Sequence, residues 1–162
     1  MRRVALAAVA VTVLAWSATA VAARNPGLPN PVLTPGATNP AVTPATIHST
    51  ICVSGYSSSV RPPESYTESL KYRQLDSGYN LRGDTRAGDY EEDHLIPLEV
   101  GGNPTSVRNL WPEPWNVTWN AGRKDHLENV MHELVCSGQV GLRTAQRMFA
   151  TNWIAGYERY VG

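Results

Sequence analysis

Two short strands and one long helix follow one another closely in the centre of the chain, and this order constrains the fold more than any other feature. Residues 90–96 are typical of a strand that enters a turn, and residues 108–111 predict a second strand after a glycine-rich loop. We expect the second strand to stop at Pro112 and Pro114. Apolar residues then recur with helical spacing over residues 121–136.

Helices are expected on both sides of this central unit. Residues 66–75 carry the spacing of a capping box, beginning at Ser65, and a glycine that can end a helix follows them. Towards the C-terminus, residues 142–150 and 152–160 predict a helical pair with apolar side chains available for a core. The sequence therefore predicts an α+β fold, with a ββα core and additional N- and C-terminal helices.

Residues 1–23 are typical of a secretory signal peptide. Arg2 and Arg3 precede an apolar run, and small residues with A-x-A spacing follow it. Residues 4–23 are also just long enough to span a membrane, so an uncleaved anchor is the alternative. The A-x-A spacing favours cleavage. After cleavage we expect no stable membrane insertion, and a protein that is secreted, periplasmic or at the cell surface.

Residues 24–47 are rich in proline and show no apolar period. Half of the twelve prolines lie here: Pro26, Pro29, Pro31, Pro35, Pro40 and Pro44. Because proline blocks helices and sheet ladders, this composition predicts a disordered, semi-stiff linker. The folded domain is then expected to span residues 48–162.

The chain has two cysteines, Cys52 and Cys136. In the oxidising compartment that follows export, they are expected to form one structural disulfide across a long loop. A metal or redox role is the alternative, but two isolated cysteines lack the C-x-x-C spacing that is typical of such sites.

The charge balance excludes a strongly basic nucleic-acid-binding protein. The chain has 14 basic and 14 acidic residues, and removal of Arg2 and Arg3 with the signal peptide leaves 12 and 14. Nucleic-acid affinity draws largely on the neutralisation of phosphates. Only a local patch can supply it here, and the candidate residues are Arg82, Arg108, Arg123 and Lys124.

The motifs in the central unit resemble those of the HNH nuclease family. A D-H-x-x-P motif at residues 93–97 is followed by a double glycine, an Asn-Leu pair and a helix. The chain is similar to small exported bacterial HNH-like proteins with the motifs EDHLIPLE-x-GG, NLWP and K-D-x-L-E, which match residues 92–102, 109–112 and 124–128. The resemblance implies a ββα-metal fold. Many relatives pin this module with two C-x-x-C pairs on zinc, which this chain lacks.

The resemblance also implies a role for each motif residue. His94 matches the general base, Asp93 the carboxylate that holds a divalent cation, and Asn109 the middle asparagine that fixes the loop between the strands. Asn120 matches the third position, a metal ligand, although its spacing to the following lysine is one residue longer than is common. His126 is the rival for that position. Asn120 can equally be only the N-cap of the helix.

These residue types suit the hydrolysis of a phosphodiester. A histidine that titrates near 6.5 can accept a proton from water at neutral pH. A carboxylate and an amide oxygen form part of an all-oxygen shell, which suits Mg²⁺, Mn²⁺ or Ca²⁺. Neighbours on a strand point to opposite faces, so Asp93 and His94 can share a site only if the strand ends there.

Two classes of function follow from these residues. The first is a secreted, metal-dependent HNH endonuclease of low sequence specificity, in which Arg108, Arg123 and Lys124 contact nucleic acid, with DNA favoured over RNA. The alternative is a catalytically inactive HNH-fold module that serves a binding or structural role in the periplasm or at the cell surface.

Overall fold

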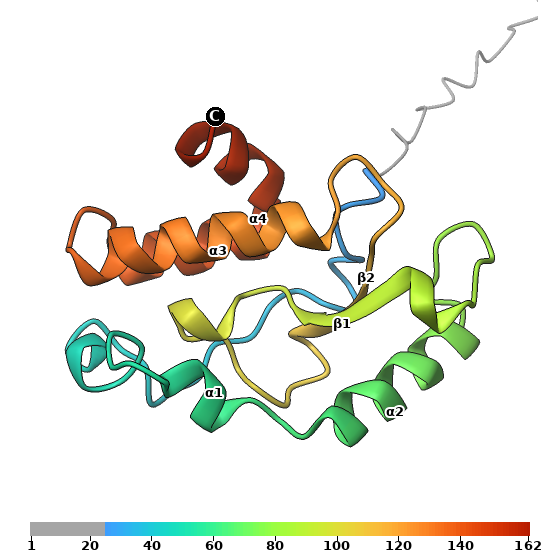
Figure 1. The fold of residues 1–162 in the computed structure, drawn as a ribbon, viewed down its shortest axis with the longest axis horizontal. Coiled ribbons are helices and arrows are strands. Elements are labelled where there is room, and N and C mark those ends of the chain that lie inside the picture. Colours follow the sequence, from blue (N-terminus) through green and yellow to red (C-terminus); the bar gives the residue numbers. More distant parts are fainter. Residues whose placement is uncertain (1–24) are drawn as a thin grey trace, which may run out of the picture.

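The computed structural model describes residues 25–162 and shows an α+β fold, in which a two-stranded antiparallel hairpin lies between helices (Figure 1). In chain order, with η for a short 3-10 helix, the elements are η1 (Ile47–Ser49), α1 (Tyr56–Val60), α2 (Glu64–Asp76), η2 (Ala87–Asp89), β1 (Tyr90–His94), η3 (Leu98–Val100), β2 (Leu110–Pro114), α3 (Ala121–Cys136) and α4 (Leu142–Tyr160). The predicted fold class is confirmed. The predicted signal peptide, residues 1–23, lies outside the described residues.

The predicted helices are present. α3 has the bounds that the apolar spacing predicted, and α2 begins at Glu64, one residue before the Ser65 expected to cap it. The predicted C-terminal pair is one long element, α4, broken at Asn152 by an extended φ of −163°. The Asn152 side chain accepts a hydrogen bond from the Ala155 N–H (3.2 Å), so it caps the second half of α4.

β2 runs through Pro112 and Pro114, so the predicted stop at these prolines is wrong. In an antiparallel ladder, hydrogen-bonded pairs alternate with pairs that are not hydrogen-bonded. The Leu95 N–H donates to the Asn109 carbonyl (2.7 Å), which places the hydrogen-bonding positions of β2 at odd residue numbers. Both prolines therefore fall where their nitrogen faces away from β1, and the hairpin loses no ladder bond.

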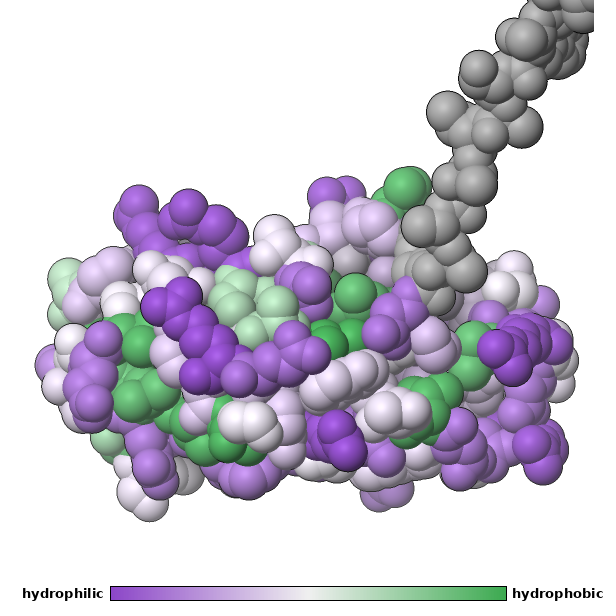
Figure 2. All heavy atoms as spheres, turned by 90° about the horizontal axis from the view of Figure 1, so that it is seen from above, coloured by the Kyte–Doolittle hydropathy of each residue, from purple (hydrophilic) through white to green (hydrophobic). Residues whose placement is uncertain are grey.

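The core lies between the hairpin and the pair formed by α3 and α4, which is above the hairpin in Figure 1, while α2 is below it. The buried side chains of α3 and α4 in this core are Leu127, Met131, Val135, Leu142, Ala145, Phe149, Trp153 and Ile154. Seen from above, the outer surface is mainly hydrophilic, with small apolar groups between polar side chains (Figure 2). Such a pattern is typical of a face that meets water.

The prediction of a disordered linker is wrong for residues 25–47, which pack onto the domain. The Trp153 indole N–H donates to the Gly27 carbonyl (2.8 Å), the Gly36 N–H donates to the Arg108 carbonyl (2.9 Å), and Val42 is buried in the core. The prolines do prevent a regular ladder, but a segment can also be held by turns and by single hydrogen bonds to the domain.

Asparagine side chains build those turns. The side-chain oxygens of Asn25, Asn30 and Asn39 each accept a hydrogen bond from the backbone N–H two residues later, at 3.0 Å in every case. Each of the three asparagines is followed by proline, whose fixed φ suits a turn. The proline-rich composition therefore produces a chain of turns here instead of a linker.

The predicted disulfide is confirmed between Cys52, which lies between η1 and α1, and Cys136, the last residue of α3. A disulfide of this kind is typical of proteins that work in an oxidising compartment outside the cytoplasm. Within residues 25–162, every helix is too short or too polar to cross a membrane.

Candidate active site

The end of β1 presents Asp93 and His94, both of them buried, to two different surroundings. The Asp93 carboxylate turns towards α3 and accepts a hydrogen bond from the Lys124 ammonium. The His94 ring turns towards the loop between the strands, where its Nε2 lies 2.9 Å from the Pro104 carbonyl oxygen. β1 ends at His94, which is the condition for a shared site, but Asp93 and His94 hydrogen-bond different partners and not each other.

The contact with Pro104 determines the tautomer of His94. A carbonyl oxygen can only accept, so Nε2 carries the proton and, in the neutral ring, Nδ1 keeps its lone pair. Among the described residues Nδ1 has no hydrogen-bond partner, and it is not fully buried. Burial lowers the pKa of His94, and the nearby charges of Lys124 and Arg61 lower it further, against the opposing effect of Asp93. The ring is therefore neutral near pH 7.

Asn109 fixes the loop between the strands. Its side-chain oxygen accepts from the Ile96 N–H (2.9 Å), and its amide donates to the carbonyls of Ile96 (3.0 Å) and Asn103 (3.1 Å). A Cβ at Gly102 would clash with the Ile96 carbonyl, so the second glycine of the pair is needed for this close approach. Asn109 thereby holds the loop that presents the Pro104 carbonyl to His94.

Lys124, predicted to contact the substrate, is instead fully buried. Its ammonium pairs with Asp93 of β1, with Glu128 one turn further along α3 (2.5 Å) and with Glu113 of β2 (3.6 Å). Because its first-turn position on α3 faces the hairpin, the ammonium joins both strands to the helix. An enclosed ammonium with three carboxyl neighbours does not meet a phosphate at the surface.

With Asp125 there are four carboxyl groups near Lys124, and they outnumber the single ammonium. Burial opposes the charge on Asp93, yet Lys124 holds the pKa of Asp93 down at about 2. Burial raises the pKa of Glu113 well above its usual value and that of Glu128 to about 8, and burial with the charge of Asp93 raises the pKa of Asp125. A further positive charge at this site would therefore be favourable, because it would allow these buried carboxyl groups to ionise.

Three of these residues, Asp93, Asp125 and Glu128, form a carboxylate cluster that can hold a metal ion. One carboxylate oxygen of each lies within 4.8 Å of the others. Beside this cluster, the fully buried carboxyl group of Glu113 receives no hydrogen bond from a protein donor and lies against the carboxyl group of Asp93. A set of oxygen ligands fits Mg²⁺, Mn²⁺ or Ca²⁺ better than a soft metal.

Asn120 and His126, the two candidates for the third motif position, contact residues outside this cluster. Asn120 is the N-cap of α3, because its side-chain oxygen accepts from the Arg123 N–H (3.2 Å). Metal ligation by Asn120 stays a prediction. His126 is exposed and stacks edge-on against Tyr157 of α4, with ring centroids 6.1 Å apart.

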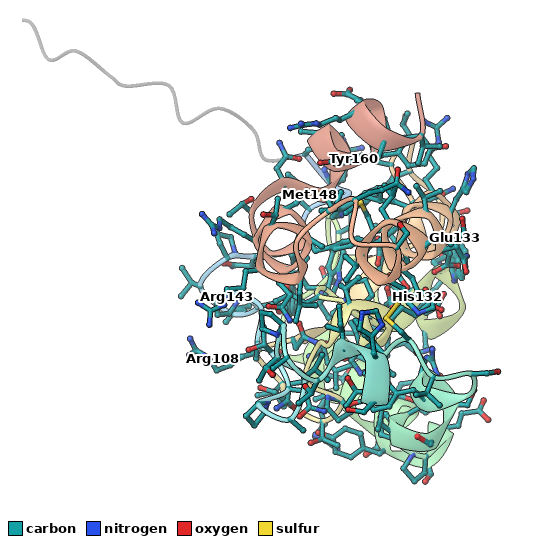
Figure 3. The ribbon with its side chains drawn as sticks, turned by 90° about the vertical axis from the view of Figure 1, so that its left-hand side faces the viewer. Arg108, His132, Glu133, Arg143, Met148 and Tyr160 are labelled. Carbon is teal, nitrogen blue, oxygen red and sulfur yellow. A yellow bond between two sulfur atoms is a disulfide. The ribbon has the colours of Figure 1, made fainter. Side chains whose placement is uncertain are left out.

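The other predicted contacts to nucleic acid, Arg108 and Arg123, lie at the surface. Arg108 projects outward from the loop before β2, and Figure 3 shows it at the edge of the molecule. The Arg123 guanidinium lies over the rings of Trp119 (4.9 Å) and Tyr157 (5.8 Å). Both arginines are therefore exposed to a ligand, but neither of them lines the groove along β1 that Arg61 borders.

Sequence reasoning missed three residues of the site: Arg61, Asp125 and Glu128. Arg61 follows α1 and lines a groove of about 410 Å³ along β1, together with Glu91 and the exposed Trp115. Its charge reaches His94 and Asp125. The K-D-x-L-E motif did contain Asp125 and Glu128, and their spacing of three residues on a helix was the available signal.

No family model matches this chain, and no match is found among curated proteins or solved structures. The assignment of a function therefore depends on the residues and geometry of the site.

Proposed function

We propose that this protein is an exported, metal-dependent endonuclease of the HNH type, which hydrolyses phosphodiester bonds of nucleic acid with low sequence specificity. The observation that carries the proposal is the state of His94. Its Nε2–H is fixed by the Pro104 carbonyl, its Nδ1 lone pair is free, and its lowered pKa keeps the ring neutral. A general base at neutral pH needs these three properties.

In the proposed reaction, Nδ1 of His94 takes a proton from a water molecule as the water oxygen attacks phosphorus. The bond between phosphorus and one ester oxygen breaks, and the leaving oxygen takes up a proton from solvent. The Pro104 carbonyl stabilises the imidazolium that forms, because it accepts a hydrogen bond from the charged ring. Asp93, Asp125 and Glu128 would hold the cation, which supplies positive charge against the charge that develops on the phosphate.

The test is a plasmid-nicking assay on the purified chain, with single-stranded DNA and RNA as parallel substrates. We expect His94→Ala to lower the rate at least about 100-fold, the usual scale for removal of a general base. His132→Ala is the matched control, because His132 on α3 also hydrogen-bonds a backbone carbonyl, that of Ile51 (2.8 Å), beside the disulfide (Figure 3). EDTA should abolish cleavage. Equal rates for His94→Ala and wild type would remove His94 from the mechanism.

One observation favours a second function, that of a non-catalytic module. The Asp93 charge is already neutralised by Lys124, so this pair can serve simply to tie β1 to α3. A binding module would take up Ca²⁺ or Mg²⁺ in calorimetry without cleaving any nucleic acid. A purely structural site would show a large stability loss for His94→Ala and a melting temperature that does not depend on metal.

A further inference from the structure

We infer that Lys124 competes with the divalent cation for this site, and that Glu113 is the carboxylate to which the ammonium moves when the cation binds. The inference deepens the proposed function, because it concerns the same metal site, but it is tested by metal binding and not by cleavage. Its basis is that the Lys124 ammonium and the metal ion would use the same carboxylates.

The overlap between the two sets of contacts is direct. Lys124 pairs with Asp93 and Glu128, and these residues are two of the three carboxylates that can hold the metal. Lys124 is 0% exposed, so water cannot screen its charge from a cation bound a few ångströms away. The cation and the ammonium therefore antagonise each other even where each uses a different oxygen of the shared carboxylates.

Glu113 is the second observation that points to a cation here. Its carboxyl group is 0% exposed, neither oxygen accepts a hydrogen bond from a protein donor, its side chain lies against the Asp93 carboxyl group, and Oε2 lies 3.6 Å from the Lys124 ammonium. A buried carboxyl group that receives no hydrogen bond from a donor and faces a second carboxyl group is costly unless another state of the protein uses it. A shift of the ammonium by about one ångström towards Glu113 would give Glu113 a hydrogen bond of ordinary length and lengthen the contacts to Asp93 and Glu128, which weakens the hold of Lys124 on the two carboxylates that the metal uses.

This arrangement gives the site two states. Without metal, the ammonium compensates Asp93 and Glu128 and keeps β1 attached to α3. With metal, the cation takes these carboxylates and the ammonium pairs with Glu113. Metal affinity is then set by the difference between the two states, so Lys124 makes it weaker than the carboxylates alone would provide.

The experiment is a calorimetric titration of the purified chain with Mn²⁺ and with Ca²⁺. We expect Lys124→Met to bind metal at least tenfold more tightly than wild type, because the competitor is removed. Glu113→Gln should bind at least threefold more weakly, because a neutral amide is a weaker alternative partner for the ammonium than a group that can become a carboxylate. Lys71→Met is the matched control: Lys71 is also a buried lysine paired with a glutamate on its own helix, Glu68 (2.7 Å), and it should stay within twofold of wild type.

Thermal melting with and without metal provides a second readout. Lys124→Met should melt at a lower temperature than wild type without metal, and metal should raise its melting temperature by more. If Lys124→Met does not fold, Lys124→Gln and Glu113→Gln decide the question through their opposite shifts in affinity.

Three results would overturn the inference: unchanged or weaker binding in the folded Lys124 variants, unchanged or tighter binding in Glu113→Gln, or no metal binding by any variant. A tighter Lys124 variant that still cleaves no nucleic acid would leave the competition standing and remove the nuclease.

Discussion

Asp93 and His94 are consecutive residues, yet their environments push their pKa values in ways that suit different tasks. Lys124 keeps Asp93 ionised, and burial keeps His94 neutral. A carboxylate that stays charged can hold a cation, while a neutral imidazole can accept a proton. The end of β1 thus separates the two roles by directing one side chain to α3 and the other to the loop at Pro104.

The lowered pKa of His94 predicts the pH profile of cleavage. The base is active only when neutral, so kcat/KM should rise with pH through the His94 pKa and then level off. Because that pKa lies below its usual 6.5, the midpoint of the acidic limb should also lie below 6.5. A bound cation would move it lower still. The check is kcat/KM measured from pH 4.5 to 8 at saturating metal, and a midpoint above 6.5 would contradict it.

Glu92 predicts a pH-dependent loss of stability. Burial, and then the charge of Asp93, raise its pKa from 4.5 to about 8, and neither carboxyl oxygen has a hydrogen bond. The folded protein therefore binds this proton more tightly than the unfolded chain does. The stability that this proton binding contributes is fully present below about pH 4.5 and is lost as the pH rises towards 8.

We therefore expect Glu92→Gln to be more stable than wild type by a few kcal/mol at pH 9, with the difference shrinking towards zero near pH 4. Urea unfolding at several pH values measures it. Every other titratable group is the same in both proteins, so the comparison isolates Glu92. Parallel stability curves for the two proteins would mean that Glu92 stays ionised in the fold.

At the scale of single residues, the sequence predicts the site residues that belong to a local motif. It does not predict those whose surroundings depend on how α3 packs against the hairpin. Asp93 and His94 follow from the D-H-x-x-P pattern. The burial of Lys124 does not, because a lysine at a helix start is ordinarily exposed. Asp125 and Glu128 become candidate ligands only because α3 docks with its first turns against β1, and nothing within α3 itself specifies that partner.

At the scale of the elements, what a proline does depends on the partner of the strand or segment that contains it. Pro112 and Pro114 were expected to end β2, but the register places their nitrogens away from β1. Residue spacing within β2 does not contain that information, since the register is set by the loop that Asn109 fixes. The apolar period of α3, in contrast, is a property of its own sequence, and its bounds were predicted correctly.

The disulfide joins the chain before α1 to the end of α3, with 84 residues of sequence separation. We expect Cys52→Ala/Cys136→Ala to lose about 4 kcal/mol of unfolding free energy, because a loop of this length restricts the unfolded chain strongly. Urea denaturation without reductant measures the difference. A reductant should bring wild type to the stability of the variant and leave the variant unchanged. A loss below about 1 kcal/mol would show that the bridge contributes little to the stability.

In the molecule as a whole, residues 25–47 contact two parts of the domain that are far apart in the sequence. They contact α4 through Gly27 and Trp153, and they contact the loop before β2 through Gly36 and Arg108. The three Asn-Pro pairs were a sequence signal for turns. They could not reveal that these turns lie against the domain, because the partners include positions more than 70 residues further along the chain.

The role of this segment in the fold predicts the effect of its removal. A chain that begins at Ile47 should be less stable than one that begins at Asn25 by at least about 3 kcal/mol, from the lost burial of Val42 and the exposed indole N–H of Trp153. The shorter chain should also cleave nucleic acid more slowly, because the Ala37 N–H bonds to the Asn109 side chain (3.3 Å) in the loop that holds His94. Urea unfolding and the nicking assay on both chains measure these losses, with the chain that begins at Asn25 as the reference. If the chain that begins at Ile47 kept full stability and activity, residues 25–46 would be an attached linker after all, and the domain would begin where its sequence composition changes.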